Sequence, residues 1–166
     1  REKGFVHFSA REDVINKEIE KRGLPITRDN MILVANDLRE KYGPSYVAQE
    51  LFNLAKDVDK SCILESLRTV GEIESLREKG SFYLFAIDAD RKIRYDRIQQ
   101  RANAHSDDVS FEKFTEQEET EMKSEDPNKQ NLSKCISMAD YVFENNGTRE
   151  ELEEKVDRII SEIFDK

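Results

Sequence analysis

The sequence predicts a single α/β domain, spanning residues 1–166, with a parallel β-sheet. Four short apolar runs alternate with longer helix-like stretches along the chain of 166 residues. Strands that alternate with helices pair in parallel through right-handed crossovers, because each helix returns the chain to the same edge of the sheet. The length fits one domain that is large enough to bury a hydrophobic core.

The first part of the chain predicts a strand followed by three helices. The strand is Phe5–Phe8, and Ser9 with Glu12 has the spacing of a capping box that begins a helix ending near Arg22. Thr27 can cap a second helix, which carries an apolar stripe at i, i+3, i+4 and i+7. The stripe consists of Met31, Val34, Ala35 and Leu38. A third helix is predicted at Tyr46–Asp57, and a strand follows at Cys62–Leu67.

The remaining chain continues the alternation of helices and strands. A helix from about Glu72 to Gly80 precedes the strand Phe82–Ile87, and a helix rich in arginine follows at Asp90–Arg101. Residues 102–131 contain two polar breaks and are predicted to form a mobile lid region. The other predicted elements are an acidic helix at Phe111–Met122, a short helix at Ser133–Met138, a strand at Tyr141–Phe143, and a final helix opened by Gly147-Thr148 with the apolar face Leu152, Val156, Ile159, Ile160 and Ile163.

The composition argues against nucleic acid and membrane partners. The chain has 27 basic and 36 acidic residues and a net charge of -9, which disfavours binding to DNA or to an anionic membrane surface. No run approaches the roughly 20 apolar residues of a membrane span, and no signal peptide opens the chain. Cys62 and Cys135 lack metal-ligand spacing and are expected to be free, buried thiols of a cytoplasmic protein.

Arginines follow two of the predicted strands and indicate an anion site. Arg68 lies just beyond one strand, while Arg94, Arg97 and Arg101 lie in the helix after another. Ligands of parallel α/β sheets bind beyond the carboxyl ends of the strands. Guanidinium groups at such a place favour a phosphorylated ligand, because their donors match the oxygens of a phosphate group.

Glu65 and Arg68 are candidates for metal and substrate contacts. An acid near the end of a buried strand can help to hold hydrated Mg²⁺ beside a nucleotide, and an arginine just beyond it can bind a substrate phosphate. The alternative interpretation is that Glu65 pairs with a nearby base and that Arg68 is a solvated loop residue.

The arginines of the predicted helix Asp90–Arg101 share one helix face. Arg94, Arg97 and Arg101 are spaced i, i+3 and i+7, and such a row can neutralise charge on a phosphoryl group during transfer. The alternative is that this face is solvated and pairs with Asp90, with Asp96 and with the acidic helix. The polar segment that follows favours function, because kinases exclude water with a closing segment.

Arg28 and Arg39 lie about three turns apart on one side of the second predicted helix. They are candidates for contacts with the phosphate of a second substrate, or they only solvate the helix. His7 and His105 have no evident partners in the sequence, and no role is assigned to either.

Taken in order, these features resemble the nucleotide-kinase branch of the P-loop proteins, in particular dephospho-CoA kinase-like and nucleoside monophosphate kinase-like domains. The resemblance covers nearly the whole chain. It rests on Asp13-Val14-Ile15, Arg22-Gly23-Leu24, Thr27-Arg28, Leu38-Arg39-Glu40-Lys41-Tyr42-Gly43-Pro44, Leu64-Glu65-Ser66-Leu67-Arg68, Glu72 with Leu76-Arg77, Arg97 with Arg101, Ala139-Asp140-Tyr141-Val142 and Asn145-Asn146-Gly147-Thr148.

The resemblance implies a three-layer αβα fold with a five-stranded parallel sheet. It also implies an ATP donor bound with Mg²⁺ and transfer of the γ-phosphoryl group to a small acceptor. The roles it implies are contacts to ATP phosphates for Arg97, Arg101 and Arg94, an acid assisting Mg²⁺ for Glu65, a grip on the acceptor for Arg68, and an acceptor-side lining of Arg28, Arg39 and Asp13. Asn16 departs from the arginine that relatives often carry, which leaves the acceptor open.

One expected motif of the resembled family is missing from these residues. The phosphate-binding loop has the pattern Gly-x-x-x-x-Gly-Lys-Ser/Thr, and no two of the six glycines are five positions apart. We therefore expect that about 25 residues forming a strand, this loop and a helix precede Arg1 in the natural chain. Without that strand, which is central in the family's sheet, two half-sheets with unpaired inner edges are expected.

Three functional interpretations follow from the sequence. The first is an ATP-dependent phosphotransferase acting on a nucleoside monophosphate, a deoxynucleotide or dephospho-CoA. The second is a non-catalytic, kinase-like module that senses a nucleotide within a larger protein. The third is an assembly domain whose arginines only balance acidic neighbours, and a homodimer or a fused partner domain remains open in each case.

Overall fold

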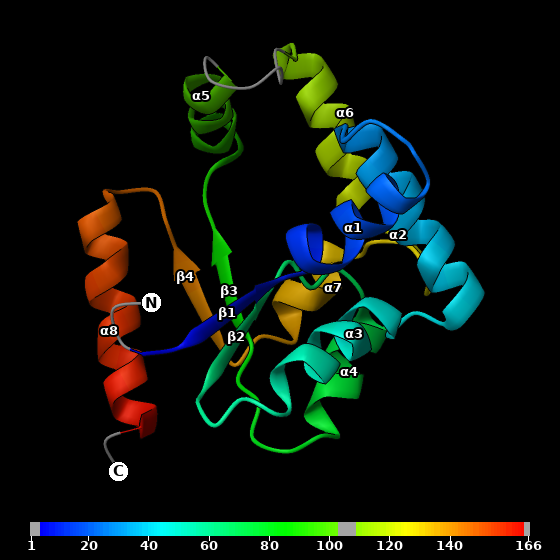
Figure 1. Ribbon diagram of the computed structural model, residues 1–166. Helices are drawn as coiled ribbons and strands as arrows, with labels where there is room; N and C mark the ends of the chain where they lie inside the picture. The colour runs from blue at the N-terminus through cyan, green and yellow to red at the C-terminus, as the bar shows by residue number, and fades with distance from the viewer. Residues whose placement is uncertain (1–3, 103–108, 165–166) are drawn as a thin grey trace. The chain divides into compact units, whose positions relative to one another are not determined.

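The structure, a computed structural model, describes residues 4–102 and 109–164, and of Arg101 and Ala102 only the backbone. These residues form a mixed α/β fold with parallel strand pairs (Figure 1). The elements in chain order are β1 (Val6–Ser9), the π-helix η1 (Ala10–Ile15), α1 (Asn16–Lys21), α2 (Arg28–Tyr42), α3 (Tyr46–Ala55), β2 (Cys62–Glu65), α4 (Val70–Arg77), β3 (Phe85–Asp88), α5 (Arg91–Ala102), α6 (Phe111–Met122), α7 (Leu132–Ser137), β4 (Tyr141–Glu144) and α8 (Arg149–Phe164).

The chain divides into two compact units. The first unit contains the residues up to Phe82 together with Glu121–Cys135. The second contains Tyr83–Thr120 together with the residues from Ile136 onward, so that the division falls near the end of α6. Among the residues that the structure describes, no helix is long and apolar enough to cross a membrane.

Each unit holds one pair of parallel strands. In the first unit β1 pairs with β2, and their last residues Ser9 and Glu65 are register partners. In the second unit β3 pairs with β4, and their last residues Asp88 and Glu144 are register partners. The predicted parallel pairing is therefore confirmed, although in the described part of the chain the strands form two separate two-stranded sheets.

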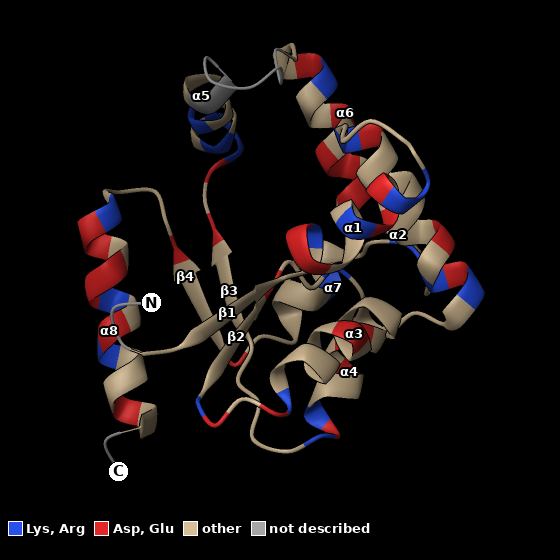
Figure 2. Ribbon diagram, in the orientation of Figure 1, with Lys and Arg blue, Asp and Glu red and all other residues tan. Residues whose placement is uncertain are grey.

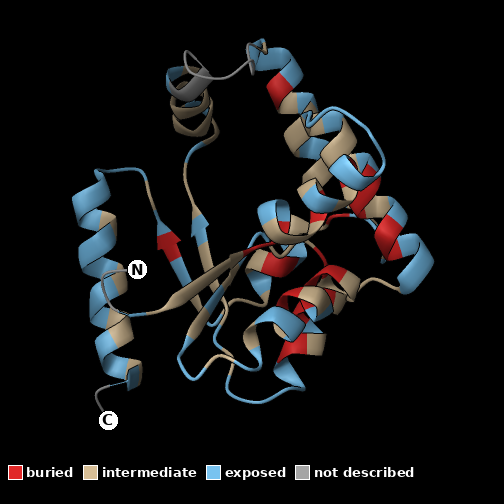
Figure 3. Cartoon of the chain, viewed as in Figure 1, coloured by how far each residue is buried: buried red, intermediate tan, exposed pale blue. Residues whose placement is uncertain are grey.

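The core of the first unit lies among its helices (Figure 3). The predicted stripe of α2 is confirmed, because Val34, Ala35 and Leu38 are buried and Met31 packs against them. The residues of the two adjoining clusters are Ile15, Ile19, Val34, Ala35 and Leu38, and then Ala10, Val47 and Leu51. Burial of these side chains, worth about 1.5–3 kcal/mol for each large one, stabilises short helices that would be marginal alone.

The second unit has a smaller core that is rich in aromatic rings. Phe114 of α6 and Phe143 of β4 are buried. Tyr95 of α5 packs against Phe114 with a centroid distance of 5.6 Å, and its hydroxyl donates to the carbonyl of Val109. The predicted apolar face of α8 is half-buried while the rest of the helix is exposed, so the direction of that face is confirmed.

The helix after β1 differs from its prediction. It begins as the π-helix η1 and continues as α1, whereas the sequence predicts one regular helix. Ser9 Oγ accepts from the backbone N–H of Glu12, as in a capping box, but the backbone N–H of Ser9 donates to Asp13 Oδ2 at 2.9 Å. The wider π-turn brings the residue at i+4 to the cap in place of the residue at i+3.

Several other boundaries shift by one to three residues from their predictions, and three of these shifts have evident local reasons. Strand β2 ends at Glu65 rather than Leu67, because Ser66 adopts a left-handed conformation with φ of 69°. Strand β3 begins at Phe85 rather than at Phe82, because the backbone N–H of Leu84 donates to the side chain of Asp140, at Oδ2, instead of to a neighbouring strand. Helix α4 begins at Val70, earlier than predicted, because Thr69 and Glu72 form a complete capping box.

Candidate functional site

The carboxyl ends of β1 and β2 bring three polar side chains together. Ser9 Oγ donates to Glu65 Oε1 at 2.7 Å, and His7 Nε2 lies 3.1 Å from Glu65 Oε2. His7 and Ser9 share one face of β1, because side chains two residues apart in a strand point the same way. His7 was given no role from the sequence, and only the strand period combined with the pairing register would have revealed its contact with Glu65.

Asp13 acts as a capping group in this unit. Its Oδ2 accepts the backbone N–H of Ser9, and its Oδ1 lies 3.4 Å from Lys17 Nζ one turn further on. The carboxylate thus ties the end of β1 to the helix that follows. A contact between Asp13 and an acceptor stays a prediction.

The loop after β2 is fixed by one buried carboxylate, that of Glu72. Glu72 Oε2 accepts the backbone N–H groups of Arg68 at 2.6 Å and Thr69 at 3.1 Å. Glu72 Oε1 lies 2.9 Å from both Nε and Nη2 of Arg39. The backbone that carries Arg68 is therefore held by hydrogen bonds to an ionised group, which are stronger than neutral ones. The sequence spacing of Thr69 and Glu72 could have indicated the cap.

Arg39 lies in the interior of the first unit. Its side chain is 1% exposed and that of Glu72 is fully buried, so the pair is shielded from water. Arg39 Nη1 is also buried and has no hydrogen-bond partner within the described part of the chain. Arg39 therefore supports the loop of Arg68 through Glu72, and its predicted contact with an acceptor stays a prediction.

Arg28 and Arg68 converge on the carboxylate of Glu121. Arg28 Nη2 lies 2.6 Å from Glu121 Oε1, and Arg68 Nη1 lies 3.1 Å from Glu121 Oε2. Arg68 Nη1 also donates to Gln130 Oε1 at 3.1 Å. Each of the two arginine side chains is about one-third exposed, whereas that of Glu121 is 11% exposed. Solvent can therefore reach the two arginines more readily than the carboxylate between them. We call Arg28, Arg68, Glu121 and Gln130 the Glu121 cluster.

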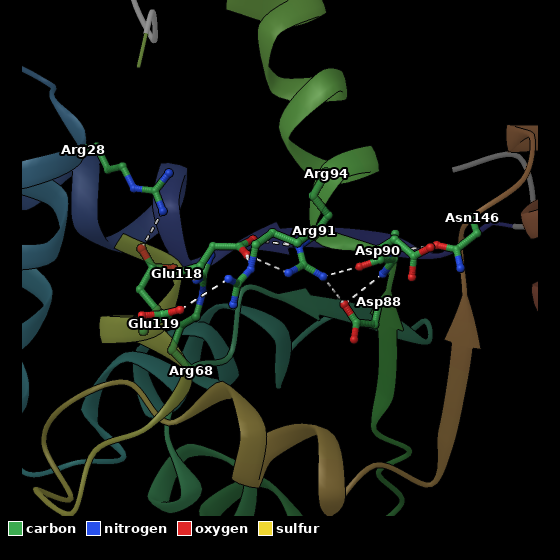
Figure 4. A network of polar contacts seen from close by, with 11 residues as sticks. Arg28, Arg68, Asp88, Asp90, Arg91, Arg94, Glu118, Glu119 and Asn146 are labelled. Carbon is green, nitrogen blue, oxygen red and sulfur yellow. Dashed lines mark hydrogen bonds and ion pairs between the residues drawn. The ribbon is translucent and has the colours of Figure 1, made fainter. Parts of the chain in front are cut away.

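In the second unit Arg94 lies between two carboxylates beyond the end of β3 (Figure 4). Its Nε and Nη2 donate to the two oxygens of Glu118 at 2.7 and 2.6 Å, a bidentate arrangement. Its Nη1 donates to Asp88 Oδ1 at 2.7 Å and also to the carbonyl of Ala89. The hydrogen bonds to Glu118 are the main cause that raises the pKa of Arg94 above its ordinary value, so the guanidinium stays charged.

Acidic residues are frequent along α6 (Figure 2), and this helix supplies Glu118, one of the two carboxylate partners of Arg94, as the alternative interpretation of the arginine face predicts. Arg91, which the sequence analysis did not single out, lies 3.4 Å from Glu118 and 3.3 Å from Glu119. Asp96 pairs with Lys92 at 2.6 Å.

Arg97 contacts backbone carbonyls after β4. Its Nη1 donates to the carbonyl of Asn145 at 2.7 Å, and its Nη2 donates to the carbonyl of Gly147 at 2.9 Å. Asn146 Oδ1 accepts the backbone N–H of Asp90 at 2.8 Å, so the turn is tied to the start of α5 by a second bond. The guanidinium of Arg97 thus fixes the turn that opens α8.

Arg101 lies on α5 one turn beyond Arg97, and its side chain lies outside the described residues, as does His105. Of the predicted lid region 102–131, the residues 103–108 are likewise not described. Within the remainder, the acidic helix is confirmed with the predicted bounds Phe111–Met122.

The two cysteines are free, and burial differs between them. Cys135 is buried, while Cys62 is partly exposed, which corrects the prediction of two buried thiols. Burial raises the pKa of the Cys135 thiol to about 11, so this thiol is neutral at physiological pH. Within residues 4–102 and 109–164, no three His, Cys, Asp or Glu side chains gather in a way that could hold a metal ion by themselves.

These elements define an α/β protein with parallel strands and arginine clusters beyond their carboxyl ends. The chain belongs to the UPF0200 family. It is 30% identical over 163 residues to a UPF0200 protein of Pyrobaculum aerophilum, a match that covers 97% of this chain and 86% of that protein.

Two further relatives differ in length. A UPF0200 protein of Thermococcus kodakarensis is 28% identical over 160 residues, or 93% of this chain and 83% of that protein. A UPF0200/UPF0201 protein of Archaeoglobus fulgidus is 30% identical over 157 residues. The match covers 91% of this chain but 46% of the Archaeoglobus protein, so the chain spans less than half of that relative. No family model matches the chain.

Proposed function

We propose that the protein is an ATP-dependent phosphotransferase that moves the γ-phosphoryl group to a small nucleotide-like acceptor. The acceptor class is a nucleoside monophosphate or dephospho-CoA, as the resemblance to P-loop nucleotide kinases implies. The observation that carries this proposal is the convergence of Arg28 and Arg68 on one carboxylate beyond the end of a parallel strand.

Two guanidinium groups aimed at one anion suit a phosphate better than they suit a carboxylate. A phosphate monoester carries a charge of about -1.5 to -2 at pH 7 and offers three acceptor oxygens. Arg28 lies at the first position of α2, and the backbone of Arg68 is held by Glu72. The two donors therefore come from supported backbone, which lowers the entropy lost when a ligand binds. In this proposal they grip the phosphate of the acceptor.

Glu65 is the residue proposed to assist Mg²⁺. Mg²⁺ in phosphotransferases is held by one or two carboxylates together with water and substrate phosphates, so one carboxylate beside a hydroxyl group fits it. Glu65 offers hard oxygen donors next to Ser9 Oγ, and its side chain is 47% exposed, so water can reach it. Bound Mg²⁺ would neutralise charge on the transferred phosphoryl group, while Ser9 and His7 orient the carboxylate.

Arg97 and Arg101 are proposed to contact the phosphates of ATP, with Arg94 beside them. Catalysis of this kind consists mainly of positioning and charge stabilisation, and guanidinium groups supply both. Two nitrogens of Arg97 donate to backbone carbonyls, and in this proposal its Nε donates to a phosphate of ATP. Asp13 and Arg39 complete the proposed acceptor side, Arg39 through its buried Nη1.

The second candidate function is a non-catalytic, kinase-like module that senses a nucleotide within a larger protein. One observation favours it. Arg94 is already neutralised by Glu118 and Asp88, which leaves it little charge to offer a phosphoryl group.

The test is ADP release by the protein, measured in a coupled assay with ATP and Mg²⁺. The acceptors are dephospho-CoA and the ribonucleoside and deoxyribonucleoside monophosphates. We expect turnover with one acceptor class, and we expect Arg68→Gln to raise the KM of that acceptor about tenfold or more, the equivalent of one charged hydrogen bond. Arg22→Gln is the matched control, because Arg22 pairs with Glu18 and Asp37 on the surface of the same unit.

The outcomes separate the two functions. Nucleotide binding in equilibrium dialysis without ADP release from any acceptor would contradict the phosphotransferase and support the sensing module. Neither ADP release nor nucleotide binding would contradict both, and the assembly interpretation would then stand.

A further inference from the structure

We propose that Glu121 is an internal competitor for the phosphate of the ligand, occupying the Arg28–Arg68 pair until a phosphate displaces it. This inference rests on the proposed function, because it assumes that the two arginines bind a phosphate. It goes further by assigning a role to a residue that the sequence analysis placed only within an acidic helix.

The contacts of Glu121 are those of a bound anion. Its two oxygens are divided between two guanidinium groups, with Arg28 Nη2 at 2.6 Å from Oε1 and Arg68 Nη1 at 3.1 Å from Oε2. The three residues come from segments far apart in the sequence, separated by 93 and 53 positions. A carboxylate held in this way takes the positions that two oxygens of a phosphate would take.

The Glu121 cluster carries a net positive charge that an anion with two negative charges would balance. Arg28 and Arg68 contribute two positive charges, Glu121 contributes one negative charge, and Gln130 is neutral. A phosphate monoester in place of Glu121 carries up to two negative charges and would balance both guanidinium groups. The exchange of a monoanion for a dianion therefore gains Coulomb energy, while the freed carboxylate returns to water.

Both arginines have supports that do not involve Glu121. Thr27 Oγ1 accepts the backbone N–H of Asn30 and caps the helix that Arg28 begins. The backbone of Arg68 is bonded to Glu72 through its N–H and to Asn131 through its carbonyl. Glu121, in contrast, is the second-last residue of α6, where a helix frays most readily. Displacement of Glu121 thus leaves the phosphate donors in place.

A competitor inside the protein lowers the apparent affinity for the ligand by the fraction of molecules in which the site is free. Replacement of Glu121 by glutamine removes the charge and keeps the shape of the side chain. We expect Glu121→Gln to bind phosphate about fivefold to tenfold more tightly than the wild type, since its competing charge is gone. Glu121→Ala should act in the same direction, because it removes the carboxylate from the arginine pair.

The experiment is a calorimetric titration of the protein with inorganic phosphate at low ionic strength. The variants are Glu121→Gln, Glu121→Ala, Arg68→Gln and the matched control Glu125→Gln. Glu125 is exposed and lies four residues further along the chain, so this control removes the same charge outside the Glu121 cluster. A change of less than twofold in Glu125→Gln is expected, and it corrects for the net charge of the protein.

A second measurement follows the release of Glu121 directly. In the wild type, phosphate should increase amide hydrogen exchange at the end of α6, because that turn loses its ion pairs. In Glu121→Gln the increase should be smaller. This readout applies even if a variant at Glu121 proves less stable than the wild type.

The outcomes distinguish the inference from the proposed function. If Arg68→Gln weakens phosphate binding but both Glu121 variants bind as the wild type does, Glu121 is no competitor and the inference fails while the phosphate site stands. If Arg68→Gln binds phosphate as tightly as the wild type, the phosphate site itself is wrong, and the inference falls with it.

Discussion

Ser9 and Glu65 end two neighbouring parallel strands as register partners, and Ser9 Oγ donates a 2.7 Å hydrogen bond to Glu65 Oε1. The same hydroxyl oxygen accepts the backbone N–H of Glu12 and so caps the helix that follows. One buried hydroxyl therefore connects a strand end, a helix start and the acid proposed to assist Mg²⁺.

The loss of this hydroxyl should be costly for a single small substitution. We expect Ser9→Ala to lower the free energy of unfolding by about 1–2 kcal/mol, since it removes a helix cap and a hydrogen bond to a carboxylate. Urea denaturation measures this change. Ser45→Ala is the control, because Ser45 lies at the N-cap of α3 without a capping bond from its side chain. Equal effects of the two substitutions would contradict the double role of Ser9.

The buried pair of Arg39 and Glu72 predicts which of two substitutions lowers the free energy of unfolding more. Arg39→Met should lower the free energy of unfolding by about 3 kcal/mol or more, because it leaves Glu72 as an uncompensated buried charge. Glu72→Met should cost more, because it also leaves the backbone N–H groups of Arg68 and Thr69 without an acceptor. Glu153→Gln, in an exposed ion pair with Arg149, should change stability by less than about 0.5 kcal/mol. Guanidinium chloride denaturation gives the three values, and the reverse order would show that Glu72 is not the central acceptor.

Cys135 makes stability depend on pH in the alkaline range. Its pKa in the folded protein is raised to about 11 by burial, above the value of 9.0 for a free thiol. The folded state therefore holds the proton more tightly, so the stabilisation is complete below pH 9 and is lost as the pH rises toward 11. We expect the difference in melting temperature between wild type and Cys135→Ala to narrow across this window. A constant difference would mean that the thiol is not shielded.

The turn before α8 predicts a coupled pair of substitutions. A Cβ at residue 147 would overlap Glu151 Oε2, the oxygen that accepts the backbone N–H of Thr148. We expect Gly147→Ala to expel Glu151 from this cap and to cost about 1 kcal/mol. In a Glu151→Ala background the same substitution should cost much less, because its effect depends on Glu151. A thermal melt of all four proteins measures the coupling, and additive effects would contradict it.

Long periodic elements could be predicted from the sequence because one face of each packs on a core. The stripe of α2, the half-buried face of α8 and the bounds of α6 follow from apolar spacing or from polar breaks alone. Parallel pairing follows from the alternation of strands and helices. What periodicity cannot predict is the register of a pair, and the contact of His7 with Glu65 depends on it.

The structure differs from the sequence-based predictions where a side chain replaces a backbone hydrogen-bond partner or where a charged side chain is buried. Arg39 lies one helical turn after Ala35, on the buried face of α2. Its burial was not expected, because arginine side chains are mostly exposed in folded proteins. Glu72 has the spacing of a cap, yet its four hydrogen-bond donors come from a loop and from another helix. The convergence of Arg28 and Arg68 on Glu121 depends on contacts across 93 and 53 residues, which no local pattern contains.

The π-helix after β1 has a consequence for comparing this chain with others. A π-turn accommodates one more residue than an α-turn over the same stretch of axis. A homologue with a regular α-helix at this place would therefore be one residue shorter between Ala10 and Ile15. Its capping carboxylate would then follow the serine by three positions rather than four. A one-residue gap in an alignment here would mark a change in helix type rather than the loss of a loop.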